Sequence, residues 1–261
     1  MSIGAKQHAV VTGGASGIGR AAAKALEAQG YRITIFDRAD PGVDGWNWVE
    51  VDLDAMAGAC PDVGGPVDVL VNAAGLPPRA GTEAVVLRVN FLALRRLTIA
   101  LMDAMPRGGR IVNMASKAGA KWRENLPQVE RLLSMPDDAE LEDFVEQEGI
   151  DPVRSYDLSK EAVVVWTKVM TATLLARDLR MNAVSPGAVE TPILTDFIDA
   201  FGERAVRGMK MTKGTGQADD IADVIAFLAS PASRWLRGCN IEADGGLSAM
   251  LDAEKLIGWQ P

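Results

Sequence analysis

A glycine-rich turn between an apolar run and an alanine-rich stretch constrains the fold of this chain more than any other feature. Residues 8–12 (HAVVT) are typical of a buried parallel strand, and residues 18–29 have the periodicity of a helix. Between them, Gly13 permits a tight turn, Gly17 lets the backbone approach a pyrophosphate, and Gly19 lets the helix pack closely on the strand. The free N–H groups at the start of this helix are suited to phosphate. The segment therefore predicts a dinucleotide-binding strand–turn–helix unit.

The alternation of apolar runs and periodic stretches continues along the chain. The expected strands are residues 8–12, 32–36, 46–51, 67–72, 109–114, 180–184 and 239–243. The expected helices of the main body are residues 18–29, 85–105, 155–177 and 219–229. Short connections between such units favour right-handed crossovers. We therefore predict an α/β fold, a single doubly wound Rossmann domain over residues 1–261, with a parallel seven-stranded sheet and helices on both faces.

An acidic segment interrupts this pattern. Residues 124–151 carry ten acids and one base, whereas the whole chain has a net charge of −8, so the remainder is almost neutral. Apolar residues at helical spacing on either side of Pro136 predict two short amphipathic helices. Asp137 followed by Glu140 predicts a capping-box start for the second of them. We interpret the segment as a helical insert whose acidic faces lie in water, in preference to one that attracts substrate.

Composition excludes several classes of function. No apolar run approaches the roughly 18 residues of a membrane span, and the N-terminus lacks a signal-peptide pattern, so we expect a cytoplasmic protein. The acidic balance argues against a nucleic-acid partner. Two isolated cysteines, Cys60 and Cys239, and a single histidine, His8, do not make a disulfide framework, a metal site or a Ser–His mechanism. We therefore expect no metal and a structural role for His8.

The residues after the second expected strand bear on cofactor choice. Asp37 lies 18 residues after Gly19, where a carboxylate accepts hydrogen bonds from the ribose hydroxyls and repels a 2′-phosphate. Arg38, the next residue, could instead bind such a phosphate. Because the aspartate already holds the ribose position, we expect NAD, with NADP the less favoured alternative and Arg38 alongside the adenine.

At this point the chain resembles the short-chain dehydrogenase/reductase family over nearly its full length. The motifs that carry the resemblance are Thr12-Gly-Gly-Ala-Ser-Gly-Ile-Gly19, Val51-Asp52-Leu53, Asn72-Ala73-Ala74-Gly75, Arg88-Val-Asn90-Phe91, Ile111-Val-Asn-Met-Ala-Ser116, Tyr156-x-x-x-Lys160, Ser185-Pro186-Gly187-Ala188-Val189-Glu190-Thr191 and Asp244-Gly245-Gly246. The resemblance implies the catalytic residues Asn90, Ser116, Tyr156 and Lys160. It implies a cofactor site made of Gly13, Ser16, Gly17, Ile18, Gly19, Asp37, Arg38, Asp52, Leu53, Asn72, Ala73, Ala74, Gly75, Tyr156, Lys160, Pro186, Gly187, Val189 and Thr191.

The chemistry expected of this family explains the residue types. A free phenol, with a pKa of about 10, is a poor base at neutral pH. Lys160 lies one helical turn after Tyr156 on the same face, and its cation is expected to lower the pKa of the phenol. The resemblance implies that Lys160 also holds the nicotinamide ribose, that Ser116 binds the substrate oxygen and that Asn90 anchors a water. Tyr31, the second tyrosine, lies away from these motifs.

Two departures from the common family pattern narrow the resemblance. Ser116 and Tyr156 are 40 residues apart because of the acidic insert, and the connection between Gly75 and Asn90 is short. Both features resemble the bacterial 3α-hydroxysteroid dehydrogenase/carbonyl reductase subgroup, and coniferyl-alcohol dehydrogenases look similar. Residues 192–216 would form a substrate lid whose apolar side chains fit a secondary or aromatic alcohol or carbonyl. They are equally consistent with ordinary helix packing.

Other interpretations remain at this stage. The six-residue spacing of Tyr and Lys in enoyl reductases is absent, which argues against that reaction. A non-catalytic NAD(H)-binding sensor on the same fold is a different class, but such proteins usually lose the tyrosine or lysine. The resemblance also implies a homodimer or homotetramer with a small-molecule substrate. We expect the insert to obstruct one family interface and to leave a dimer joined through the last strand.

Overall fold

A parallel sheet forms the centre of the molecule. The structure is a computed structural model that describes residues 6–56, 61–254 and 256. Within these residues the strands are β1 (His8–Thr12), β2 (Arg32–Asp37), β3 (Asn47–Glu50), β4 (Val69–Asn72), β5 (Arg110–Met114), β6 (Arg180–Pro186) and β7 (Asn240–Ala243). Their order is β3-β2-β1-β4-β5-β6-β7, and every neighbouring pair is parallel. The doubly wound seven-stranded sheet is confirmed, with strand ends within a few residues of the expected ones.

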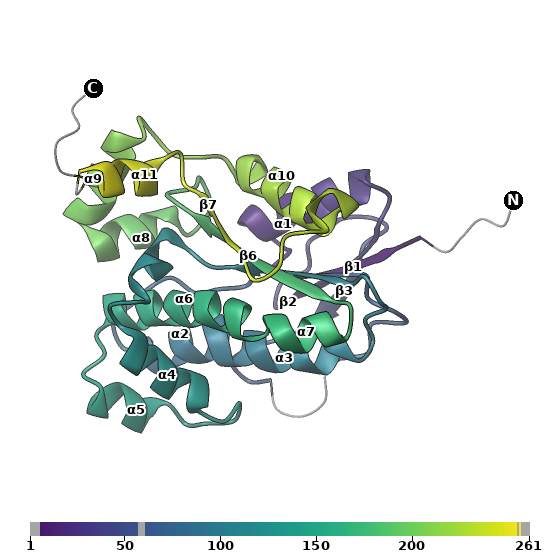
Figure 1. Ribbon diagram of the computed structural model, residues 1–261, viewed down its shortest axis with the longest axis horizontal. Helices are drawn as coiled ribbons and strands as arrows, with labels where there is room; N and C mark the ends of the chain where they lie inside the picture. The colour runs from purple at the N-terminus through teal and green to yellow at the C-terminus, as the bar shows by residue number, and fades with distance from the viewer. Residues whose placement is uncertain (1–5, 57–60, 255, 257–261) are drawn as a thin grey trace, which may run out of the picture.

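Helices cover both faces of this sheet (Figure 1). The helices of the described residues are α1 (Gly17–Ala28), α2 (Glu83–Leu87), α3 (Leu94–Met102), α4 (Leu126–Ser134), α5 (Glu142–Gln147), α6 (Pro152–Val169), α7 (Thr171–Ala176), α8 (Leu194–Phe201), α9 (Glu203–Met211), α10 (Ala218–Ala229) and α11 (Leu247–Ala253), with short 3₁₀ turns η2 (Lys117–Lys121) and η3 (Pro231–Ser233). Helices α1 and α10 lie on one face, and α2, α3, α6 and α7 on the other. None of the described helices is long and apolar enough to cross a membrane.

The core is divided into two parts by the sheet. Successive residues of β1 belong to different parts: Val10 packs with the α3 and α6 side, whereas Ala9 and Val11 pack with the α1 and α10 side. Because side chains alternate across a strand, a strand that is buried on both faces must be apolar throughout. This explains why residues 8–12 read as one continuous apolar run. His8, the polar first residue of β1, is also buried, and its Nε2 lies 2.8 Å from Thr34 Oγ1, which satisfies the ring nitrogen.

The helix expected over residues 85–105 is not a uniform α-helix. It runs from α2 into a π-helical segment, η1 (Arg88–Ala93), and then into α3. Asn90 lies in the wide turn, and its side chain is held from outside the helix: Oδ1 accepts from Leu76 N at 2.7 Å and Nδ2 donates to Leu76 O at 3.1 Å. Such π segments are frequent at functional sites. Hydrophobic periodicity does not distinguish them from ordinary helix.

The acidic insert contains two short helices, as expected, and packs outside the main helices. Helices α4 and α5 lie beyond α2 and α6 (Figure 1). Arg95 of α3, which is largely buried, fastens the end of α4 by donating to Leu133 O at 2.7 Å and Met135 O at 2.5 Å. It also binds the Asp137 carboxylate.

The capping box expected at Asp137 and Glu140 is wrong. Helix α5 begins only at Glu142, with Leu141 preceding it, because the Asp137 carboxylate is bound to Arg95 instead of capping a helix. Several acids of the insert are also paired and not simply solvated. Arg131 binds Glu148, and Arg88 of the main body binds Glu142.

Candidate functional site

A large cavity opens at the carboxyl ends of the strands. Its volume is about 1290 Å³, more than the roughly 300–1,000 Å³ of a pocket for one drug-sized ligand, so it has room for a dinucleotide and a substrate together. The predicted residues that line it are Gly13, Ser16, Gly17, Ile18, Gly19, Asp37, Arg38, Asp52, Leu53, Ala73, Ala74, Gly75, Ser116, Tyr156, Lys160, Pro186, Gly187, Val189 and Thr191. Asn72 and Asn90 are not part of the lining. Both are buried one layer behind it.

The glycine turn has the close packing that its sequence predicts. Gly13 has a φ of +68°, and a Cβ there would lie 2.7 Å from the backbone of Ala74. A Cβ at Gly19 would lie 2.2 Å from the Gly13 carbonyl oxygen. Larger residues at these two positions would displace the loop from the sheet. The loop leads directly into α1, and the first N–H groups of that helix are available to bind phosphate.

Asp37, at the end of β2, is held across the mouth of this loop. Its Oδ2 accepts a hydrogen bond from Ala15 N at 3.0 Å and its Oδ1 accepts one from Ala39 N at 3.1 Å. These two bonds fix the carboxylate at the edge of the cavity, next to the exposed Arg38. A fixed negative charge at this place disfavours a second phosphate on the ribose.

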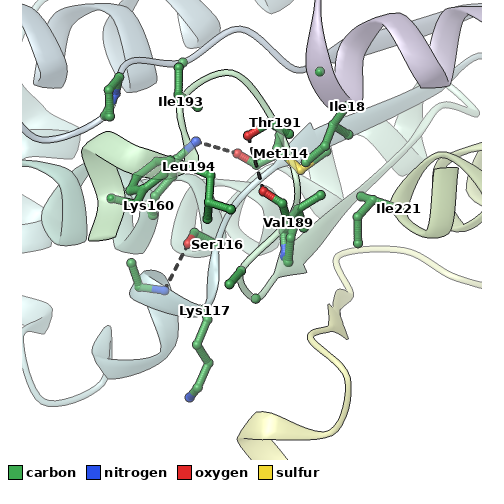
Figure 2. Close-up of a pocket in the computed structure, with 18 of the residues that line it drawn as sticks. Ile18, Met114, Ser116, Lys117, Lys160, Val189, Thr191, Ile193, Leu194 and Ile221 are labelled. Carbon is green, nitrogen blue, oxygen red and sulfur yellow. Dashed lines mark hydrogen bonds between the residues drawn. The ribbon is translucent and has the colours of Figure 1, made fainter. Parts of the chain in front are cut away.

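Three of the four predicted catalytic side chains, those of Ser116, Tyr156 and Lys160, come together on one wall. Tyr156 and Lys160 project from α6, and the Lys160 ammonium lies 5.6 Å from the centre of the Tyr156 ring. Lys160 Nζ donates to the Met114 carbonyl at 2.9 Å, two residues before Ser116, so the lysine is fixed to the end of β5 (Figure 2). The Ser116 hydroxyl accepts from Ala118 N at 3.1 Å and interacts with the Tyr156 side chain. The structure thus unites Ser116, Tyr156 and Lys160.

Burial shifts both ionisable groups towards their neutral forms. It lowers the pKa of Lys160 from 10.5 to about 8. It raises the pKa of the Tyr156 phenol, and the hydrogen bond with Ser116 opposes this only in part. The expected net lowering of the phenol pKa is therefore wrong for the cofactor-free chain. The physical reason is that the ring is enclosed by apolar side chains, which disfavours the phenolate.

The two asparagines brace the wall from behind. Asn90 Nδ2 donates to Ser159 Oγ at 3.2 Å, and its bonds to Leu76 described above fix the segment after Gly75. Asn72 Nδ2 donates to Thr98 Oγ1 and to Asn113 Oδ1, both at 2.9 Å. These bonds tie β4 to α3 and β5, so Asn72 supports the sheet directly beneath the cavity.

The segment predicted to be a lid contributes aromatic side chains to the wall of the cavity. On α8, Phe197 and Phe201 lie parallel with their ring centres 6.0 Å apart, and both meet the Tyr156 ring at steep angles, with centres 4.9 and 6.0 Å away. Leu194 lies in the same wall (Figure 2). The aromatic wall that Phe197 and Phe201 form is consistent with an aromatic ligand.

Charged residues that the motifs did not indicate also reach the cavity. Arg79, in the loop after β4, binds Asp196 of α8 at 2.8 Å, and Arg204 of α9 binds Asp157 of α6 at 2.9 Å. Both arginines line the cavity. No local sequence signal identifies them, because each acts through a partner from a distant part of the chain. No group of three or more His, Cys, Asp or Glu side chains suited to a metal occurs in the described part of the chain, from which Cys60 is excluded.

Comparisons with known proteins agree with this geometry. The chain matches the family model described as short chain dehydrogenase over residues 7–47 and 49–128, and one described as Enoyl-(Acyl carrier protein) reductase over residues 142–248. A coniferyl-alcohol dehydrogenase of Pseudomonas sp. (strain HR199 / DSM 7063) is 36% identical over 92% of this chain and 96% of that protein. A 3-alpha-hydroxysteroid dehydrogenase/carbonyl reductase of Comamonas testosteroni is 30% identical over 93% and 96%. The crystal structure of a 3-alpha-hydroxysteroid dehydrogenase from Pseudomonas sp. B-0831 complexed with NADH has a TM-score of 0.79 at 27% identity, covering 96% of this chain and 100% of that chain.

Proposed function

This chain belongs to the short-chain dehydrogenase/reductase family, which makes it an oxidoreductase of alcohols or carbonyls with a nicotinamide cofactor, and we propose that it transfers hydride between NAD(H) and a secondary or aromatic alcohol or the corresponding carbonyl. The observation that carries the proposal is the meeting of Ser116, Tyr156 and Lys160 on one wall of a cavity that also holds the glycine turn.

The cavity fits a dinucleotide. The phosphate loop lies tight against the sheet, at a distance that a Cβ at Gly13 or Gly19 would prevent. Asp37 is fixed where it can bind both ribose hydroxyls. Gly187, Val189 and Thr191 also line the cavity, and a Cβ at Gly17 would lie 3.4 Å from the Thr191 side chain. When bound, the nicotinamide supplies or accepts the hydride. The choice of NAD over NADP rests on the Asp37 carboxylate.

In this proposal the protein residues handle the proton and the substrate oxygen. The Tyr156 phenol donates its proton to the carbonyl oxygen in reduction, and the phenolate takes a proton from the alcohol in oxidation. Ser116 binds the same oxygen and orients it towards Tyr156. Lys160 provides the positive charge that stabilises the phenolate, and Asn90 keeps the segment at Gly75 in place behind them. Because burial raises the pKa of Tyr156, the acid form prevails at neutral pH, and oxidation is expected to be faster at higher pH.

The aromatic side chains of the predicted lid support the proposed substrate class. Phe197 and Phe201 place two aromatic faces beside the Tyr156 ring, where a planar substrate can pack edge to face with them. A coniferyl-type aromatic alcohol is the specific candidate that this wall favours, and a relative of that name shares 36% identity with the chain. Enoyl reduction is not proposed, because Tyr156 and Lys160 lie four residues apart on α6 and both reach the cavity.

The decisive experiment follows NADH absorbance with a panel of aromatic and aliphatic ketones and alcohols. We expect turnover with NAD(H) in preference to NADP(H), and a loss of about 10²–10⁴-fold in kcat for Tyr156→Phe with NADH binding retained. The matched control is Tyr31→Phe, which removes the only other phenol of the chain and lies near Ala229, outside the cavity lining. Binding of NADH without turnover on any substrate would instead favour the sensor. Asp37→Ser is expected to improve the use of NADP.

A further inference from the structure

The residue after Tyr156, Asp157, carries a buried carboxylate whose ion-pair partner, Arg204, comes from the predicted lid. The Asp157 side chain is only 15% exposed. Its Oδ2 accepts from Arg204 Nη1 at 2.9 Å, and its Oδ1 is buried without a hydrogen-bond partner in the described structure. A buried carboxylate needs a compensating cation, and its one ion pair here is with Arg204. Asp157 directly follows Tyr156 on α6, and its charge is close enough to act on the Tyr156 phenol, whose pKa it raises.

Arg204 reaches this position from a distant part of the chain. It belongs to α9, lines the cavity, and places its guanidinium carbon 4.8 Å above the centre of the Phe201 ring. That ring in turn meets Tyr156 at 6.0 Å between centres. Arg204 therefore contacts both the aromatic wall and the helix that carries Tyr156.

We propose that Arg204 is a positioning residue for the proton-transfer step: by pairing with Asp157 it cancels the negative charge beside the Tyr156 phenol and sets the pH range in which that phenol exchanges its proton with the substrate. This inference rests on the proposed function for its kinetic test. It assigns a role in proton transfer to a lid residue that no sequence motif marks.

The directions of the electrostatic effects agree with this geometry. The Asp157 carboxylate raises the pKa of the Tyr156 phenol, and the Arg204 guanidinium lowers it. For Asp157 itself burial raises the pKa, and Arg204 opposes this. Removing Arg204 alone takes away the ion pair of the carboxylate and leaves only the weaker effect of Arg154, whereas removing both Arg204 and the Asp157 charge leaves little net change. The other charged groups of this region include Lys160, Glu161 and Arg154 on α6, Lys117 and Lys121 on η2, Arg79 with Asp196 of α8, and Arg207 on α9, which also lines the cavity and pairs with Glu254.

The test is the pH profile of kcat/KM for alcohol oxidation by the complete protein with NAD. Arg204→Gln is expected to raise the midpoint of the ascending limb by about 0.5–1 pH unit, because the phenolate then forms next to an unpaired carboxylate. Arg204→Gln combined with Asp157→Asn is expected to return the midpoint close to that of the wild type. Arg204→Lys, which keeps the charge, is expected to keep the midpoint as well.

The matched control is Arg207→Gln. It removes an ion pair from the same helix, the one with Glu254 at 2.8 Å, without touching Asp157, and its midpoint is expected to equal that of the wild type. The proposal is overturned if Arg204→Gln and Arg207→Gln have the same midpoint. It is equally overturned if the shift persists in the double variant, because Arg204 would then act by packing the lid.

A second measurement separates failure of this inference from failure of the proposed function. The chain has two tyrosines, so Tyr31→Phe leaves Tyr156 as the only phenol. Carbon-13 NMR of labelled tyrosine in the NAD complex then follows its ionisation without turnover. Arg204→Gln in this background is expected to move the titration to higher pH, and an unchanged titration contradicts the inference. Absence of turnover in the wild type, in contrast, contradicts the proposed function alone.

Discussion

Replacing Lys160 with methionine should make the folded protein more stable while it removes activity. Burial lowers the pKa of Lys160 from 10.5 to about 8. Because each pH unit of difference in pKa corresponds to about 1.4 kcal/mol, keeping this ammonium charged costs the folded state about 3 kcal/mol at pH 7. Methionine avoids this cost but loses the hydrogen bond to the Met114 carbonyl, which is worth about 1–2 kcal/mol. The expected net gain at pH 7 is about 1–2 kcal/mol in the free energy of unfolding.

The pH dependence gives the sharper form of this prediction. Since the folded pKa lies below the unfolded one, the unfolded chain binds the extra proton between about pH 8 and 10.5. The free energy of unfolding of the wild type therefore rises with pH over that window, by about 3 kcal/mol in total. Below the window the folded state bears the full cost of the buried charge. In Lys160→Met this rise is absent. The advantage of the variant at pH 7 should therefore shrink, and then reverse, as the pH approaches 10.5.

Urea unfolding of the cofactor-free protein at pH 7 and pH 9.5 measures both effects. The matched control is Lys168→Met, the same substitution two turns further along α6 at an exposed position, which should change stability by no more than about 0.5 kcal/mol at either pH. A difference between Lys160→Met and the wild type that does not depend on pH would refute the reasoning. So would a variant clearly less stable than the wild type at pH 7.

Further predictions concern the rest of the chain. The pKa of His8 is lowered, chiefly by burial, so the unfolded chain binds its proton first and stability should fall as the pH drops below about 6.5; His8→Gln should flatten this loss in thermal unfolding. Arg95→Ala removes three bonds that hold the insert and should cost about 2–4 kcal/mol in urea unfolding, with faster hydrogen exchange confined to α4 and α5 if the insert opens locally. Gly19→Val should weaken NADH binding at least about tenfold in fluorescence titration, because its Cβ would overlap the Gly13 carbonyl. Light scattering should show a dimer joined through β7 and its neighbouring helix, close to the turn before β7 where Trp235 is 89% exposed, and a stable tetramer would contradict this.

The sequence alone determined the features that depend on local pattern. Strands buried on both faces must be continuously apolar, so the sheet could be read from runs such as residues 8–12. The glycine turn and the spacing of Tyr156 and Lys160 could be recognised because each requires particular residue types a few positions apart. The acidic insert was detectable because its charge differs from that of the rest of the chain.

Only the tertiary structure decided what depends on partners distant in the chain. It showed that Asn90 lies in a π-helical turn held by Leu76, because hydrophobic period does not record how a helix is braced from outside. It reversed the expected direction of the Tyr156 pKa, because burial of the ring outweighs the opposing hydrogen bond with Ser116. It also brought Arg204 to Asp157 across 47 residues. Pairings of this kind are set by how the elements pack, and a local motif carries no information about them.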